Sequence, residues 1–166
     1  MAAHTAAVRR GGPELFIVGD MPFLSYRWGR DLAVKNAGKL MCAGASAVKL
    51  EGAAGNLDTV THLVESGIPV MGHLGLTPQS VHQLGGMRVQ GRDNGAGERL
   101  KRQALELQQA GCFALVLELV PSRLSAEVTS SLQIPTIGIG AGAQTDGQVL
   151  VLHDMLGFNA GFHPKF

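Results

Sequence analysis

The sequence has few charged residues and no long hydrophobic run. Charged side chains make up 16% of its 166 residues, below the usual ~25%. The net charge of +1 gives no basic surface of the kind that binds nucleic acid. No apolar run reaches the ~18 residues of a transmembrane helix, and the first residues lack the hydrophobic core of a signal peptide. We therefore expect a cytoplasmic protein that binds neither nucleic acid nor a membrane.

Cysteine is scarce, and two common nucleotide-binding motifs are missing. Cys42 and Cys112 lie far apart in apolar stretches, which argues against a disulfide framework and for a reducing compartment. We expect both to be buried as small hydrophobic side chains. No Gly-x-Gly-x-x-Gly follows the first apolar run, and the glycine-rich residues 138–142 lack a Walker lysine. Nothing therefore indicates a dinucleotide-binding fold or a P-loop.

Short apolar runs alternate with stretches of helical periodicity. Most of the apolar runs are continuous, which is typical of strands buried on both faces of a parallel sheet. The runs cover residues 15–19, 47–50, 69–72, 114–119, 135–139 and 148–152. The helical stretches cover residues 28–43, 57–66, 98–110 and 123–132, the last with Ser122 as its expected cap. The first three of these helices are each followed by a glycine, Gly44, Gly67 or Gly111, as C-caps prefer.

This alternation predicts βαβ units around a parallel sheet, in one domain over residues 1–166. It leaves an open sheet and a closed barrel as alternatives. The polar, glycine-rich residues 85–97 stand between a strand and a helix. We interpret them either as a lid at the catalytic end of the sheet or as a plain surface loop.

Ionisable residues occur where the apolar runs end: Asp20, Lys49 with Glu51, His73, Glu118 and, after the sixth run, Asp154. A buried strand has no packing use for such a residue, and burying one without a partner is costly. In parallel barrels the carboxyl ends of all strands converge on one face, which carries the chemistry. The first four apolar runs end in five such residues, and we expect these five to meet on that face: Asp20, Lys49, Glu51, His73 and Glu118. Each of them alone could instead be part of a structural ion pair or a helix cap.

These residue types suit metal-assisted enolisation of an α-keto acid. Asp20 and Glu51 are oxygen ligands of the kind Mg²⁺ prefers. Lys49 points to the same side of its strand as Glu51 and could neutralise a substrate carboxylate or an enolate. Glu118 could act as general acid or base. His73 could donate a hydrogen bond, ligate a metal or be purely structural.

Blocks of residues along the whole chain carry a resemblance to one family. They are residues 4–11 (HTAAVRRG), 20–23 (DMPF), 48–52 (VKLEG), 72–80 (GHLGLTPQS), 89–92 (VQGR), 117–118 (LE), 120–121 (VP), 137–142 (IGIGAG), 153–154 (HD) and 164–166 (PKF). In this order they resemble the ketopantoate hydroxymethyltransferase family, and residues 72–80 are the most specific block.

The resemblance implies a Mg²⁺-dependent (β/α)₈ TIM barrel of the phosphoenolpyruvate/pyruvate type, in a cytoplasmic homo-oligomer. The implied reaction opens pantothenate biosynthesis: a hydroxymethyl group passes from 5,10-methylenetetrahydrofolate to 3-methyl-2-oxobutanoate, giving 2-dehydropantoate. By motif, Asp20 would bind metal and keto acid, Lys49 the substrate and Glu51 the metal. Glu118 would be the proton acceptor, and His73 would lie beside the substrate.

The chain also departs from the family pattern. It offers about six of the eight βα units, and it lacks the family's Val-Gly-Asp-Ser motif, whose Asp is a metal ligand. We therefore expect the chain alone to be much less active than an intact enzyme. Two alternatives stay open: an inactive barrel fragment, or a related enolising lyase or mutase. The Lys-Lys-Cys-Gly-His signature of the lyases is absent from the sequence.

Overall fold

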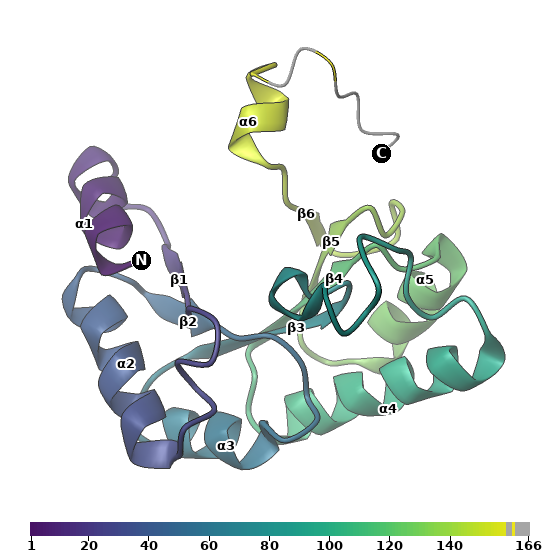
Figure 1. The fold of residues 1–166 in the computed structure, drawn as a ribbon, viewed down its shortest axis with the longest axis horizontal. Helices are drawn as coiled ribbons and strands as arrows, with labels where there is room; N and C mark the ends of the chain where they lie inside the picture. The colour runs from purple at the N-terminus through teal and green to yellow at the C-terminus, as the bar shows by residue number, and fades with distance from the viewer. Residues whose placement is uncertain (159–160, 162–166) are drawn as a thin grey trace.

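A curved sheet of six parallel strands forms the centre of the computed structural model, which describes residues 1–158 and 161 (Figure 1). The strands are β1 (Val18–Asp20), β2 (Ala47–Lys49), β3 (Val70–Gly75), β4 (Ala114–Glu118), β5 (Thr136–Ile139) and β6 (Gly147–Gln148). Each pairs with its neighbours in the sequence. A doubly wound sheet would instead reverse its strand order at a switch point. The sheet is thus an open section of a βα barrel, which confirms the barrel alternative.

Four helices connect successive strands and cover the outer face of the sheet (Figure 1). They are α2 (Arg30–Cys42), α3 (Leu57–Glu65), α4 (Asn94–Gln109) and α5 (Ser122–Ser131). Three further elements lie outside this repeat: α1 (Ala2–Gly11) before β1, the 3₁₀ helix η1 (Pro78–Ser80) after β3, and α6 (Leu152–Met155) after β6. None of the helices within residues 1–158 has the length and apolar character that a bilayer crossing requires.

Strand register sorts the side chains onto two faces, because successive residues of a strand point to opposite sides. Asp20 pairs with Lys49, Lys49 with Met71, and Gly75 with Glu118, so these residues share the inner face of the barrel wall. Apolar residues of the opposite face are fully buried beneath the helices; they include Val48, Val70, Leu115 and Leu117. Strand register therefore places Asp20, Lys49, His73 and Glu118 on the inner face.

Helix ends follow the glycine pattern of the sequence. Gly44, Gly67 and Gly111 lie directly after the C-caps of α2, α3 and α4, with φ of 103°, 82° and 100°. This confirms the expected helix stops. The expected cap at Ser122 is wrong, since Ser122 is the first residue of α5 and its side chain makes no capping bond. Helix α4 begins four residues earlier than expected because Asp93 caps it.

Two strands differ in length from the expectation. The third continues to Gly75, so His73 lies within β3 rather than at its end. The sixth keeps only Gly147–Gln148, and most of the apolar run at 148–152 leads into α6. A strand lasts as long as its neighbour pairs with it: β3 has β4 beside it to Gly75, whereas β6 pairs only with Ile137 and Gly138 of β5.

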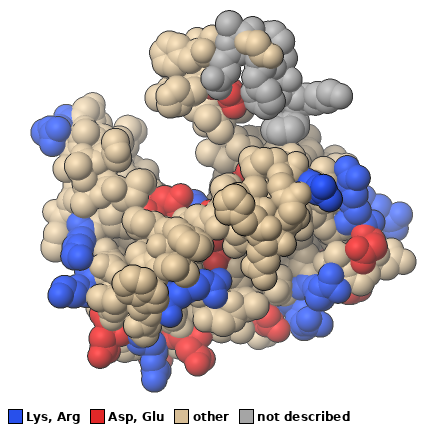
Figure 2. Space-filling view, in the orientation of Figure 1, with Lys and Arg blue, Asp and Glu red and all other residues tan. Residues whose placement is uncertain are grey.

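The first element and one cysteine also differ from the expectation. Helix α1 was not predicted, and the first strand begins at Val18 rather than at residue 15. Cys112 is buried as expected, and burial raises the pKa of its thiol to about 12. Cys42 is exposed, which contradicts the expected burial, because it lies at the last position of α2. On the face shown in Figure 2, basic and acidic atoms alternate along the lower rim.

Candidate active site

An ion pair joins the ends of β1 and β2 on the inner face. Asp20 and Lys49 are register partners, and the Lys49 Nζ lies 3.0 Å from the Asp20 Oδ1. The lysine side chain is 17% exposed and the aspartate 41%. The inner face thus presents one carboxylate that solvent reaches and one cation that is mostly enclosed.

His73 connects this pair to the other carboxylates. Its Nδ1 lies 3.3 Å from the Lys49 Nζ and 3.8 Å from Glu51 Oε1, and its Nε2 lies 3.2 Å from Glu118 Oε2. An ammonium group can only donate, so a hydrogen bond from Lys49 to His73 requires Nδ1 as the acceptor and the ring proton on Nε2, on the side of Glu118. The Nε2 contact is close but not aligned as a hydrogen bond. One buried imidazole therefore touches the side chains of three other candidate residues.

Glu51 is held in place by residues that sequence reasoning missed. The backbone N–H of Gln79 donates to Glu51 Oε2 at 3.0 Å, and the Glu51 N–H donates to the Tyr26 hydroxyl at 3.3 Å. That hydroxyl donates in turn to the side-chain oxygen of Gln79 at 3.1 Å. Burial raises the pKa of Glu51, although His73 and Lys49 partly oppose the rise. Gln79 belongs to the specific block 72–80, but nothing in the sequence marked Tyr26.

The end of β4 places Glu118 through an unusual backbone. Leu119 has a φ of 46°, a left-handed conformation uncommon outside glycine. The Leu76 N–H donates to the Glu118 carbonyl at 2.7 Å, and the Gln90 N–H donates to the Leu119 carbonyl at 2.8 Å. A side chain at Gly75, with φ +89°, would lie 2.1 Å from the Glu118 carbonyl oxygen. Strand β3 and the segment before α4 thus fix Glu118 together.

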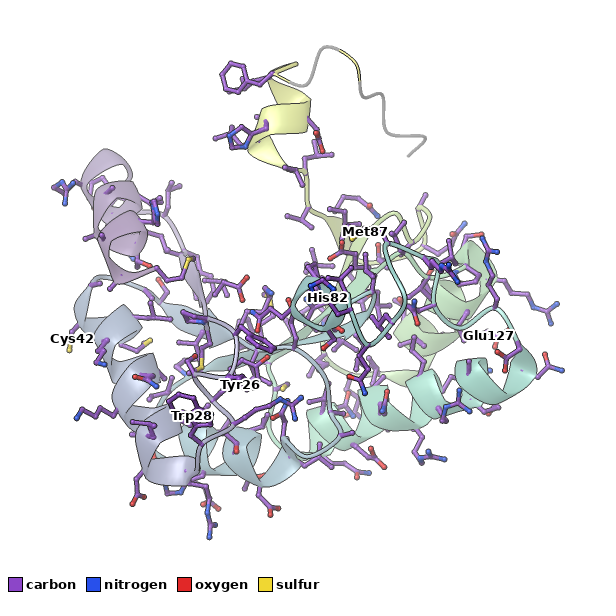
Figure 3. The ribbon with its side chains drawn as sticks, viewed as in Figure 1. Tyr26, Trp28, Cys42, His82, Met87 and Glu127 are labelled. Carbon is purple, nitrogen blue, oxygen red and sulfur yellow. The ribbon has the colours of Figure 1, made fainter. Side chains whose placement is uncertain are left out.

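The segment between η1 and α4 lies at the carboxyl end of the strands. A lid, the first of the two interpretations of residues 85–97, would have to lie there. The Gln90 bond anchors it to Leu119, directly after β4, and Figure 3 labels His82 and Met87 on this segment. Its last residues, from Asn94 onward, belong to α4 instead. Whether the segment closes as a lid stays a prediction.

The carboxylates fit a magnesium ion only as an incomplete ligand set. Within residues 1–158 and 161, no three His, Cys, Asp or Glu side chains are placed to hold one metal ion. Asp20 and Glu51 nevertheless supply the one or two carboxylates that Mg²⁺ takes when water and substrate complete its shell. Asp154 lies on α6, where it lines a cavity of about 420 Å³ at β5 and β6.

The structure therefore brings together all five residues expected to meet: Asp20, Lys49, Glu51, His73 and Glu118. A family model described as ketopantoate hydroxymethyltransferase matches residues 1–166. The chain belongs to this family. The roles of the five residues within the family's reaction stay predictions.

Two relatives agree with this assignment, and a solved structure shares the fold. The chain is 63% identical to the 3-methyl-2-oxobutanoate hydroxymethyltransferase of Bdellovibrio bacteriovorus and 56% identical to that of Legionella pneumophila. All of the chain aligns, over 63% and 64% of the two relatives' lengths. The structure of 2,3-dimethylmalate lyase, a PEP mutase/isocitrate lyase superfamily member, matches 91% of the chain and 52% of its own, with a TM-score of 0.61 at 15% identity. That structural likeness supports the barrel fold.

Proposed function

We propose that this chain carries most of the enolisation site of a 3-methyl-2-oxobutanoate hydroxymethyltransferase. The observation behind the proposal is the unbroken series of side-chain contacts Asp20–Lys49–His73–Glu118 across β1 to β4. It places a cation, an imidazole and a carboxylate around one inner-face position. Family membership and the names of the relatives supply the substrate.

In this proposal Glu118 removes the proton from C3 of the keto acid. A carboxylate at the end of a strand can reach a substrate bound on the inner face, and general base catalysis is worth ~10²–10⁴-fold in rate. Lys49 stabilises the negative charge that develops on the carbonyl oxygen. The His73 Nε2 lies 3.2 Å from Glu118 Oε2 and would orient this carboxylate between proton transfers once the contact aligns as a hydrogen bond.

A divalent ion held by Asp20 and Glu51, with ligands from outside these residues, would polarise the carbonyl of the keto acid as a Lewis acid. The transfer then forms one carbon–carbon bond. The enolate C3 and the oxygen of a water molecule become bonded to the methylene carbon of 5,10-methylenetetrahydrofolate, and both of its bonds to the folate nitrogens break. The proton taken from C3 by Glu118 and one proton of the water go to those two nitrogens, so that tetrahydrofolate leaves.

The proposal is tested by proton NMR in D₂O, following the C3 signal of 3-methyl-2-oxobutanoate with the chain, with and without Mg²⁺. We expect Mg²⁺-dependent exchange, and we expect Glu118→Gln to slow it by ~10²–10⁴-fold. The matched control is Glu65→Gln, which removes an exposed carboxylate at the end of α3 and should change nothing. Exchange that ignores Glu118, or that proceeds equally without Mg²⁺, would contradict the proposal.

A further inference from the structure

A second cavity, of about 810 Å³, borders the cluster without being part of it. Its lining includes Gly52, which follows Glu51, and Leu74 and Gly75, which follow His73. It also includes Thr77 and Ser80, on either side of the Gln79 N–H that holds Glu51. The volume lies within the ~300–1,000 Å³ typical of small-molecule sites. The cavity thus extends from the catalytic end of β2 and β3 outward over α4.

The charge of the cavity is one-sided. Arg27 and Arg99 line it, and among the described lining residues none is acidic. Within residues 1–158 and 161, neither guanidinium has a carboxylate within ion-pair distance, although seven ion pairs form elsewhere. Elsewhere on α4, Lys101 and Arg102 both have carboxylate partners. Two unpaired guanidinium groups facing one cavity favour an anionic ligand.

Arg27 is positioned by backbone features that leave room for it. Its Nη1 donates to the carbonyl of Ala54 at 3.3 Å, and its guanidinium stands 5.8 Å from the centre of the Tyr26 ring. A Cβ at Gly52 or Gly55, both with positive φ, would lie 3.6 and 3.4 Å from its nitrogens. The absence of side chains there lets the group lie across the loop after β2. These contacts hold the exposed Arg27 side chain on the cavity wall.

The remaining lining suits a long ligand with an aromatic part. Phe23 is 64% exposed at the rim, where an aromatic ring could stack on it. Gln83, Gln90 and Gln103 add side-chain amides along the wall. An aromatic contact, amide donors and two cations in one channel match a ligand that carries an aryl amide and ends in carboxylates.

We propose that this cavity binds the p-aminobenzoyl-glutamate tail of the folate co-substrate, with Arg27 and Arg99 binding its carboxylates. This inference rests on the proposed function, which places the one-carbon donor at the cluster. The pterin end then lies toward Glu118, and the tail runs outward between the loop after β2 and the start of α4. The cavity is lined by the loop after β2, the end of β3 and the first half of α4, and none of its lining residues belongs to the edge strands β1 and β6.

Binding is measured by titrating the chain with tetrahydrofolate and with tetrahydropteroate, which lacks the glutamate. We expect Arg27→Gln and Arg99→Gln each to weaken tetrahydrofolate binding about two- to fivefold, as for single exposed ion pairs, and to leave tetrahydropteroate binding unchanged. Arg102→Gln, three residues further along α4 and outside the cavity lining, is the matched control and should alter neither. Circular dichroism checks that each variant is folded.

Three results would overturn the inference: no binding of tetrahydrofolate, equal affinity of the arginine variants and the parent chain, or equal losses for both ligands. Displacement of tetrahydrofolate by inorganic phosphate at equal concentration would also overturn it, because the cavity would then be a general anion site. Mg²⁺-dependent exchange of the keto acid C3 proton is read in parallel and needs no folate. If C3 proton exchange is normal but tetrahydrofolate binding does not depend on Arg27 and Arg99, only the folate-tail inference is wrong. If C3 proton exchange is absent, the proposed function is wrong.

Discussion

Glu51 is the residue whose environment conflicts most with its charge. It is buried, and burial raises its pKa above the ordinary value of 4.5 despite the opposing effects of His73 and Lys49. A group with a raised folded-state pKa contributes stability that is complete below its unfolded pKa and is lost as the pH rises through the folded value. Ionisation of Glu51 therefore destabilises the metal-free chain toward neutral pH.

This reasoning predicts the behaviour of Glu51→Gln in buffer with a chelator. The variant keeps a side-chain oxygen for the Gln79 N–H but cannot ionise. The measured quantity is the free energy of unfolding of Glu51→Gln minus that of the parent chain. This difference should increase as the pH rises above about 4.5, by at most ~1.4 kcal/mol per pH unit, and should then level off. Urea unfolding at a series of pH values measures it, with Glu65→Gln, whose side chain is exposed, expected to give a flat difference. A difference that decreases with pH would mean that Lys49 and His73 outweigh burial.

Much of the cluster could be predicted residue by residue, because strand ends and strand parity follow from sequence. Asp20, Lys49, Glu51 and Glu118 were recognised as ionisable residues at the ends of apolar runs. His73 was found by the same rule, although it lies inside β3. Tyr26 and Gln79 could not be found this way. Their hydrogen bonds to Glu51 depend on how two irregular segments fold back over the sheet, 25 and 28 residues away in the chain.

At the scale of the helix, α4 shows how one side chain sets a boundary. Asp93 is its N-cap, and the Asp93 Oδ1 accepts from the Ala96 N–H at 2.8 Å. Asp93→Ala should cost about 1 kcal/mol of stability, while Asp93→Asn should be nearly neutral. Ser122→Ala is the matched test, because Ser122 makes no capping bond in α5 and its loss should cost well under that. Chemical unfolding measures all three. A larger loss for Ser122 than for Asp93 would contradict the assignment of the caps.

Element types were more predictable than element lengths. The four connecting helices and their glycine stops follow from periodicity and from the left-handed C-cap, both local properties. Strand ends are set by the neighbouring strand, which no local pattern reveals. The apolar residues 148–152 predicted a longer strand, yet β5 offers pairing only to Gly147 and Gln148. Helix α1 escaped notice because only one of its residues, Thr5, is buried, so no apolar stripe marks it.

At the scale of the whole molecule, the open barrel wall leaves two sheet edges. Within the described part of the chain, β1 pairs only with β2 and β6 only with β5. Large apolar side chains lie exposed at both edges. Leu15 and Phe16 are 59% and 65% exposed just before β1, and Leu150 is 69% exposed just after β6. Unpaired edges beside exposed apolar residues favour association between chains.

We therefore predict that the chain self-associates as its concentration rises, and that Phe16→Lys shifts this equilibrium toward the monomer. A lysine beside an edge strand disfavours edge-to-edge pairing. The lost contact inside the chain is small, because Phe16 is 65% exposed; its ring meets the Phe113 ring in an edge arrangement, at a centroid distance of 5.8 Å. Met87→Lys is the matched control, since Met87 is 66% exposed but lies on the segment between η1 and α4 and belongs to neither edge strand. Sedimentation velocity across a concentration series measures the monomer fraction. An equal effect of both substitutions would mean that general surface charge, rather than the β1 edge, controls association.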